Sequence, residues 1–158
     1  MLVDIPYLWV ALLNIVWVPL AHLAASWFAT KLPSSLFQTN ALTLPFIKGE
    51  SRSFYESRLQ IKRWKDKLPD AAQWFGGEQK AELKERSQDY LQRFILETRR
   101  GEFAHVLQIV LLCIPVLWTP WPWALIFPVY AVLSNITCIP IQRYNRLRFE
   151  KLLRGRNR

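Results

Sequence analysis

Residues 103–141, FAHVLQIVLLCIPVLWTPWPWALIFPVYAVLSNITCIPI, decide the fold of this chain. They contain no Lys, Arg, Asp or Glu, and they are long enough for two membrane-crossing helices of about 20 residues each. The stretch WTPWPW at 118–123 combines prolines, which interrupt helices, with tryptophans, which favour the membrane–water interface. We therefore predict a transmembrane helical hairpin over 104–141 with its turn at 118–123.

A second apolar stretch near the N-terminus predicts another membrane-crossing helix within residues 1–31. It covers residues 5–29, enough to cross a bilayer with some tilt. No Lys or Arg precedes Lys31, and the run is longer than the apolar part of a signal peptide, so we expect a retained helix. Asn14 and His22 lie within it, and we expect them to hydrogen-bond to neighbouring helices.

Residues 32–103, between the two apolar regions, are polar and predict a cytoplasmic or interfacial helical segment. They hold 13 Lys and Arg against 10 Asp and Glu. Their beginning is loop-like, and helical spacing of apolar residues follows over 54–64 and again from Glu78. The predicted fold class is an all-α integral membrane protein with about three transmembrane helices and a helical segment between the first and second.

The distribution of positive charge predicts the orientation of the chain in the cell membrane. The tail 142–158 carries seven basic residues against Glu150, whereas the tryptophan-rich turn carries no charge. Because Lys and Arg gather on cytoplasmic flanks, we predict a multi-pass protein with its N-terminus outside and its C-terminus in the cytoplasm. The basic tail, with Phe149, Leu152 and Leu153 among its charges, is expected to lie on the anionic membrane surface.

The net charge of +9 also raises nucleic acid as a partner. The positive excess lies beside apolar spans, however, and no zinc-finger, RNP or helix-turn-helix pattern accompanies it. We therefore expect membrane lipids as partners and no nucleic acid. The sequence does not define the oligomeric state.

The segment ETRRGEFAH at 97–105 holds the candidates for catalysis. Around a helix, Glu97, His105 and Glu102 fall at about 0°, 80° and 140°, so the imidazole lies between two carboxylates on one side. A carboxylate can orient an imidazole and stabilise its cation, which makes the ring a usable general base. The alternative is a structural ion-pair cluster at the headgroups. The cost of placing ionisable groups near hydrocarbon favours the functional interpretation.

Polar residues at the end of the last apolar span are candidates for substrate binding. Asn135 is either an amide that bridges helices or a group that holds a substrate carbonyl or hydroxyl. Arg143, Asn145 and Arg146 follow at the mouth of this span, where they either face the membrane surface or bind an anionic ligand.

A basic stretch, KRWKDK at 62–67, is the third candidate. Its basic residues are Lys62, Arg63, Lys65 and Lys67. They form either a solvated helix face or a site that neutralises the phosphates of a donor such as coenzyme A.

Together these stretches resemble the glycosyl-4,4'-diaponeurosporenoate acyltransferase family of small bacterial membrane proteins. The matching segments are Arg63-Trp64-Lys65-x-Lys67-x-x-Asp70, Glu97-Thr-x-Arg-x-Glu102-x-x-His105, and Asn135 with Gln142-Arg143-Tyr144-Asn145-Arg146-x-Arg148. The chain departs from the family pattern at Gly101 and Leu147. The resemblance implies transfer of a fatty acyl group from an activated donor such as acyl-CoA to a hydroxyl of a lipid-like glycoside such as a carotenoid glycoside. It also implies that Asp70 and Tyr144 belong to the substrate-binding residues.

The resulting hypothesis is an interfacial O-acyltransferase. His105 takes the proton from the acceptor hydroxyl, and Glu102 or Glu97 holds the imidazole. The oxyanion is stabilised by one of three side chains, Arg143, Asn145 or Asn135. Acyl-CoA is a co-substrate, and we expect neither a cofactor nor a bound metal.

Two other classes of protein remain open from the sequence. One is a non-catalytic membrane scaffold subunit of a pigment or envelope pathway. The other is a metal-dependent membrane enzyme with Glu97, Glu102 and His105 as ligands. The identity of the acceptor and the length of the acyl chain are also open.

Overall fold

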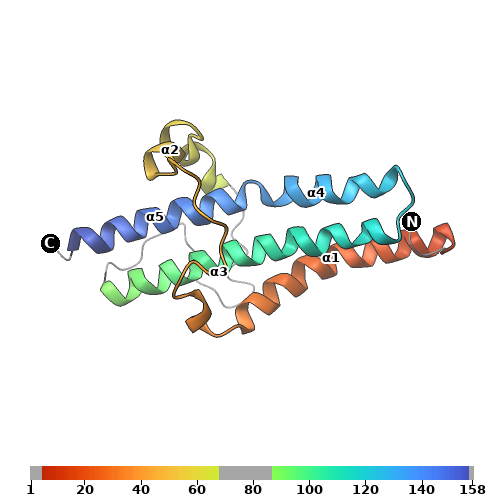
Figure 1. Ribbon diagram of the computed structural model, residues 1–158, viewed down its shortest axis with the longest axis horizontal. Coiled ribbons are helices and arrows are strands. Elements are labelled where there is room, and N and C mark those ends of the chain that lie inside the picture. Colours follow the sequence, from red (N-terminus) through yellow and green to blue (C-terminus); the bar gives the residue numbers. More distant parts are fainter. Residues whose placement is uncertain (1–4, 68–86, 157–158) are drawn as a thin grey trace.

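The computed structural model describes residues 5–67 and 87–156, and every regular element in those ranges is helical. An elongated bundle (Figure 1) is formed by α1 (Tyr7–Lys31), α3 (Gln88–Cys113), α4 (Ile126–Asn135) and α5 (Cys138–Arg156). The stretches long and apolar enough to cross a membrane are Tyr7–Lys31, Gln88–Leu117 and Trp123–Gly155. The start of α1 and the end of α5 lie at opposite ends of the bundle, as an odd number of crossings requires. The predicted fold class is confirmed.

The described part of the segment between α1 and α3, residues 32–67, holds short helical elements instead of the longer helix predicted over 54–64. These elements are η1 (Ser34–Phe37), α2 (Arg52–Ser57), η2 (Ile61–Arg63) and η3 (Lys65–Lys67). The Ser51 hydroxyl begins α2 by accepting a hydrogen bond from a backbone amide at 3.2 Å. Gln60, with a φ of 48°, interrupts the helical run in the left-handed region. Asp70 and the first part of the helix predicted from Glu78 lie outside the described residues.

α3 lies at the centre of the bundle and packs against α1, α4 and α5. The buried residues of α1 are Val10, Ala21, Ala25 and Ala29. Small side chains let helix backbones approach closely, which is a main source of attraction between helices surrounded by lipid. Ala21, Leu112 and Ala131 form the core where α1, α3 and α4 meet.

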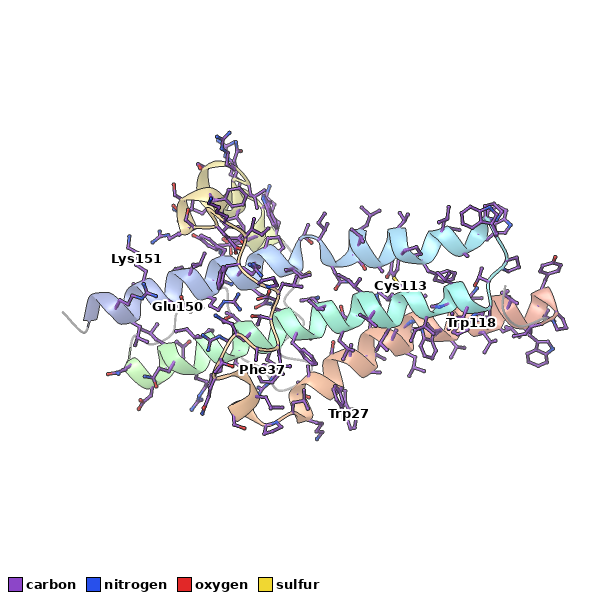
Figure 2. The ribbon with its side chains drawn as sticks, viewed as in Figure 1. Trp27, Phe37, Cys113, Trp118, Glu150 and Lys151 are labelled. Carbon is purple, nitrogen blue, oxygen red and sulfur yellow. The ribbon has the colours of Figure 1, made fainter. Side chains whose placement is uncertain are left out.

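Large apolar side chains cover the outward faces of the membrane-crossing stretches. Trp27 points away from α1 (Figure 2) and is 57% exposed. On α4, Val129 and Leu133 are also exposed. A continuous apolar surface of this kind is unfavourable in water and suits contact with lipid tails.

Polar residues of α1 hydrogen-bond to other parts of the bundle. The prediction of a bond to a neighbouring helix is confirmed for His22, whereas Asn14 bonds to the turn at 118–119. The Asn14 amide donates to Thr119 Oγ1 at 3.1 Å and accepts from Trp118 Nε1 at 2.8 Å, near the turn that follows α3 (Figure 2). His22 Nε2 lies 3.2 Å from the Tyr130 hydroxyl. These bonds join α1 to the turn and to the second arm of the predicted hairpin.

α3 and α5 run unbroken through the segment boundaries predicted at 103–104 and 141–142. α3 continues straight through Gly101. Charged residues beside these boundaries pair between the two helices, Glu102 of α3 with Arg143 and Arg146 of α5. The third crossing breaks at 136–137, between α4 and α5, because Pro140 has no N–H to donate to the carbonyl four residues earlier.

The basic C-terminal tail packs against α3 as part of α5. Phe149 is 1% exposed. It forms a core cluster with Leu91, Phe94 and Ile95 of α3. Leu153 packs against the same cluster, whereas Leu152 is exposed. The prediction that the tail lies on a membrane surface was therefore wrong for Phe149 and Leu153, because the first turns of α3 offer them an apolar protein surface.

We expect Phe149→Ala to lower the free energy of unfolding by about 3 kcal/mol, since it leaves a cavity between α3 and α5. Leu152→Ala, at an exposed position three residues on, should cost about 0.5 kcal/mol or less. Denaturant titration in detergent micelles measures both values. Equal effects of the two substitutions would indicate that the tail does not pack on α3.

Candidate active site

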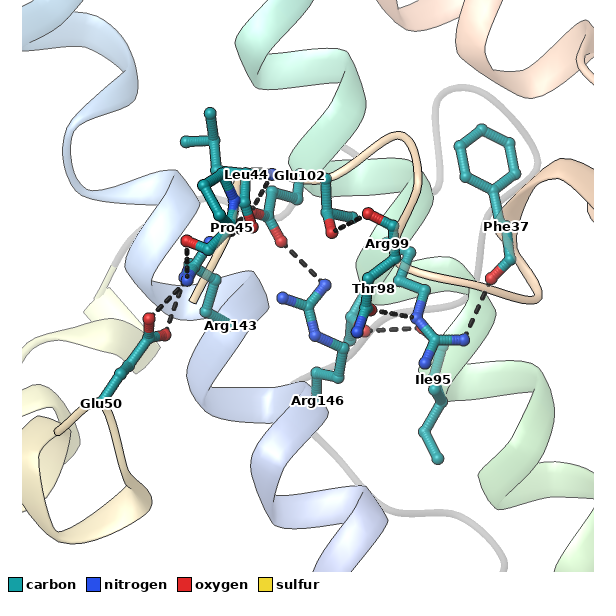
Figure 3. A network of polar contacts seen from close by, with 12 residues as sticks. Phe37, Leu44, Pro45, Glu50, Ile95, Thr98, Arg99, Glu102, Arg143 and Arg146 are labelled. Atoms are coloured by element: carbon teal, nitrogen blue, oxygen red, sulfur yellow. Dashed lines mark hydrogen bonds and ion pairs between the residues drawn. The ribbon is translucent and has the colours of Figure 1, made fainter. Parts of the chain in front are cut away.

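Glu102 is the centre of a buried charge cluster between α3 and α5 (Figure 3). Its side chain is 0% exposed, with Oε1 2.7 Å from Arg143 Nη1 and Oε2 2.8 Å from Arg146 Nη1. The Leu44 amide also donates to Oε1 at 3.1 Å. One carboxylate between two guanidinium groups offsets the desolvation penalty that each buried charge would carry alone. Glu102 therefore holds α3, α5 and the segment after α1 together.

Arg143 uses all five of its N–H groups within the protein. Nε and one Nη2 hydrogen bind the Glu50 carboxylate, and one Nη1 hydrogen binds Glu102. The two remaining hydrogens are donated to the carbonyl oxygens of Leu44 at 3.0 Å and Pro45 at 3.1 Å. A guanidinium has no further donor, so the oxyanion role predicted for Arg143 does not fit. This side chain instead holds the segment 44–50 against α5.

Glu50 anchors the other end of that segment, and its side chain is 2% exposed. Gly49, with a φ of 85°, supplies the left-handed turn that brings it into place. Burial raises the pKa of Glu50, but hydrogen bonds from Arg143 and Tyr55 lower it by more than burial raises it. The pKa of Glu50 therefore lies below its ordinary value. Sequence reasoning missed Glu50, because a lone acidic residue in a loop gives no periodic signal.

Arg146 and two neighbouring amides keep buried polar atoms without a hydrogen-bond partner among the described residues. The Arg146 side chain is 0% exposed, and its Nε and Nη2 have no partner. The Phe46 ring lies against its guanidinium, 5.0 Å from the ring centroid. Asn145 Oδ1 and Gln142 Oε1 are also buried and unpartnered. Gln142 belongs to a stretch that the sequence singled out, but it had been assigned no role.

The orientation of the His105 ring is set by side-chain amides. Nδ1 lies 2.8 Å from Asn135 Oδ1 and 3.3 Å from Gln108 Oε1. Asn135 Nδ2 donates to the Ala131 carbonyl at 3.0 Å, so Oδ1 is the acceptor of this amide. Nδ1 of His105 therefore carries the proton, and in the neutral ring the lone pair lies on Nε2. This is the tautomer that a general base requires.

The structure gives the task of holding the imidazole to Asn135, whereas the sequence assigned it to Glu102 or Glu97. Glu102 is committed to two arginines, and Glu97 forms an ion pair with Arg100. Both hydrogens of the Asn135 amide are donated within α4, so Asn135 has none for an oxyanion. The helical spacing was predicted correctly, but a sequence does not show which partners a neighbouring helix supplies.

Two arginines of α3 fasten the segment that follows α1. Arg99 donates to the carbonyl oxygens of Phe37 at 3.1 Å and Gln38 at 2.8 Å (Figure 3). Arg100 donates to Ser34 Oγ at 3.0 Å. These contacts explain the Arg-Arg pair beside Glu97 as a structural feature.

Three of the basic residues at 62–67, Lys62, Arg63 and Lys67, are exposed on a lobe formed by α2, η2 and η3, whereas the Lys65 side chain is 10% exposed. Lys62 pairs with Glu56 at 3.1 Å, and Lys65 forms an ion pair with Asp66. Arg63 donates to a neighbouring glutamine, and Lys67 is exposed. Ion pairs at exposed positions are weak and readily exchanged. Lys62, Arg63 and Lys67 are therefore available to another anion, and Lys65 is less accessible.

Tyr144 docks this lobe on α5. Its hydroxyl donates to Glu56 Oε1 at 3.0 Å, and its ring packs against Tyr55 and Ile61. A hydrogen bond from Arg52 lowers the pKa of Glu56 to about 2, so the carboxylate stays ionised over the physiological range. With 1% of its surface exposed, Tyr144 joins two parts of the protein, whereas the family resemblance suggested contact with substrate.

The three residues considered for a metal site are held in other ways. Within 5–67 and 87–156, no group of three His, Cys, Asp or Glu side chains is arranged to hold a metal ion. Arginines already neutralise Glu97 and Glu102. A divalent cation at Glu102 would have to displace a guanidinium or lie beside it.

Fold and site define a helical membrane protein with three crossings, a hydrogen-bonded histidine and a buried arginine–glutamate cluster. The chain belongs to the glycosyl-4,4'-diaponeurosporenoate acyltransferase family, whose sequence profile matches residues 24–155. It is similar to the enzymes of this name from Staphylococcus aureus strains bovine RF122 / ET3-1 and USA300, each 27% identical over 79% of this chain and 76% of the relative. No solved structure matches it. The predicted family and the assignment as an acyltransferase are confirmed.

Glu50→Gln should remove part of the acid sensitivity of the fold. Because the folded pKa of Glu50 lies below its ordinary value of 4.5, its stabilisation is complete above that pH and is lost as the pH falls through the folded pKa. We expect the wild-type Tm in detergent to fall between about pH 5 and pH 3. Glu50→Gln should begin lower and fall less, and Asp66→Asn, at an exposed carboxylate, should follow the wild type. Parallel curves for all three proteins would contradict this role of Glu50.

Proposed function

We propose that this protein is a membrane-bound O-acyltransferase that moves a fatty acyl group from acyl-CoA to a hydroxyl of a lipid-like glycoside. The observation that carries the proposal is the fixed tautomer of His105, whose Nδ1 proton is held by Asn135 at 2.8 Å. A histidine with a basic Nε2 in a member of an acyltransferase family is suited to deprotonate a hydroxyl.

In the proposed reaction, His105 Nε2 accepts the proton of the acceptor hydroxyl. The oxygen attacks the thioester carbonyl carbon, a new C–O bond forms and the C–S bond breaks. The leaving thiolate of coenzyme A takes the proton from the imidazolium, which returns the ring to its neutral form. Asn135 acts through His105 as a positioning residue, since its amide keeps Nδ1 protonated throughout.

The donor's phosphates are proposed to bind the basic lobe. Lys62, Arg63, Lys65 and Lys67 are close in sequence, and the present partners of Lys62 and Arg63 are weak surface contacts. A phosphate could replace these partners with shorter, charge-assisted bonds. The lobe is anchored to α5 through Tyr144, next to the arginine cluster, which keeps the donor's head on the same part of the bundle as the site.

The acceptor class is taken from the relatives, which are named for a glycosyl-4,4'-diaponeurosporenoate. Such a molecule has a long apolar body and a sugar. The exposed apolar faces of the bundle would lie beside the apolar body in the bilayer. A carotenoid glycoside is therefore the acceptor that we propose for this chain.

The proposed orientation places the C-terminus in the cytoplasm, because the basic residues gather on one side of the apolar stretches. A C-terminal fusion to green fluorescent protein should then fluoresce, and a C-terminal fusion to alkaline phosphatase should be inactive. The same reporters inserted at the tryptophan-rich turn should behave in the opposite way. Active phosphatase at the C-terminus would reverse the orientation.

The decisive experiment for the activity is mass spectrometry of lipid extracts from cells that express the wild type or His105→Ala and are supplied with glycosylated terpenoid acceptors. The wild type should produce a species heavier by one fatty acyl group. His105→Ala should produce it at least about 100-fold more slowly, the usual contribution of a general base. If His105→Ala forms the product as fast as the wild type, His105 is not the general base. If well-expressed wild type forms no product, the scaffold alternative is favoured.

Asn135 variants separate positioning from folding in the same assay. Asn135→Asp keeps an oxygen that accepts from Nδ1, whereas Asn135→Leu has a similar volume and no acceptor. We expect Asn135→Leu to lower kcat with little change in the KM for the donor, and Asn135→Asp to restore most of kcat. Equal losses of kcat and of thermal stability in both variants would indicate a merely structural amide.

A further inference from the structure

We propose that Gln142, Asn145 and Arg146 form a binding site for a neutral, polyhydroxylated head group, the sugar of the acceptor. The inference rests on the proposed function and adds to it the place where the acceptor is recognised. It starts from the buried polar atoms that the protein itself leaves without partners.

Unpartnered buried polar atoms are costly and uncommon in folded proteins, so a cluster of them calls for an explanation. Here they are both donors and acceptors. The donors are Nε and Nη2 of Arg146, and the acceptors are Gln142 Oε1 and Asn145 Oδ1. Glu102 Oε2 also has no hydrogen bond beyond its ion pair with Arg146.

This mixture distinguishes between classes of ligand. A phosphate or carboxylate offers acceptors only, and it would meet the oxygens of Gln142, Asn145 and Glu102 unfavourably. Charge adds to the argument, because the carboxylates of Glu102 and Glu50 already balance Arg143 and Arg146. A hydroxyl accepts from a guanidinium and donates to an amide oxygen at the same time. Several hydroxyls on one ring match the cluster, whereas the sequence suggested an anion.

The three residues lie on the face of α5 that meets α3. Asn145 and Gln142 precede the buried Phe149 by four and seven residues, which places them on the same side of α5 as Phe149. Arg146 reaches Glu102 of α3 from this side as well. The Gln142 amide lies against Gly101, where an added Cβ would come within 2.8 Å of it. His105 is one helical turn beyond Gly101 on the same face of α3. A sugar bound at Gln142 would thus lie beside the general base.

A ligand could reach this cluster from the surface of the bundle at Gln142. The residue is half-buried, as are Gly101 and His105, so this strip of the α3–α5 interface reaches the surface of the bundle. Gln142 has a flexible side chain whose amide can turn toward a ligand. Arg146 lies deeper and is covered by Phe46.

Two glycines of the chain make a matched test. Gly101→Ala pushes the Gln142 amide from its place without removing a polar group, and only the end of a flexible side chain has to move. Gly155→Ala makes the same change on α5 at a position where a Cβ meets nothing within 4 Å. Gln142→Leu is the second variant, because it removes the amide itself.

The full-length proteins are purified in a polyoxyethylene detergent, which has no sugar, and titrated with dodecyl glucoside while tryptophan fluorescence and Tm are followed. Dodecyl phosphate and a dodecyl polyoxyethylene ether are titrated in parallel. We expect the glucoside to bind the wild type and Gly155→Ala equally, and Gly101→Ala and Gln142→Leu about 5- to 10-fold more weakly, as for the loss of one hydrogen bond.

The outcomes separate this inference from the proposed function. Equal affinity of all variants for the glucoside would overturn the sugar site, and so would tighter binding of the phosphate or the polyoxyethylene ether. Acyl transfer with an unchanged acceptor KM in Gly101→Ala and Gln142→Leu would also overturn it, while leaving the acyltransferase intact. Selective glucoside binding without any acyl transfer would uphold the site and refute the reaction.

Discussion

The structure depends on the neutralisation of charge between α3 and α5. Glu102, fully buried between Arg143 and Arg146, allows two helices rich in charged residues to pack side by side next to apolar stretches. The same pairs fasten the segment 44–50, since Arg143 reaches Glu50 and two backbone carbonyls. Removing the carboxylate would leave the buried Arg146 cation and the Leu44 amide without their acceptor, and Arg143 with Glu50 as its one remaining carboxylate partner. The packing of α3 on α5 and the geometry of the site therefore depend on this one side chain.

The sequence predicted the parts of the fold that follow from hydrophobicity alone. Three crossings, the tryptophan-rich turn and the hydrogen bond of His22 to a neighbouring helix could all be derived from apolar length and from polar residues inside it. It failed where charged residues were assumed to face water or headgroups. Phe149 and its neighbours belong to α5 because α3 offers them a surface, and no local pattern in the tail indicates this.

The site was predicted in part for a related reason. Residue types and helical spacing indicated His105, but the choice of its partner depends on how α4 lies against α3. Asn135 could be singled out as a polar residue in an apolar span, while its bond to Nδ1 is a tertiary contact. Glu50 gave no sequence signal, and although Arg146 was a binding candidate, the sequence did not show that its Nε and Nη2 lack partners. The family resemblance singled out stretches that meet between α3 and α5, but it did not distinguish residues that join parts of the protein, such as Tyr144, from residues that could contact a ligand.

The distance between the charge cluster and the tryptophan-rich turn has a consequence for the lipid. Glu102 and Trp118 are separated by about 16 residues of helix, about 24 Å, whereas the hydrocarbon core of an ordinary bilayer is about 30 Å thick. Hydrophobic mismatch of this sign is relieved when the bilayer thins around the protein. The bilayer would then be thinner beside α3 than elsewhere. A water-soluble donor head group at the membrane surface would lie closer there to an acceptor dissolved in the hydrocarbon.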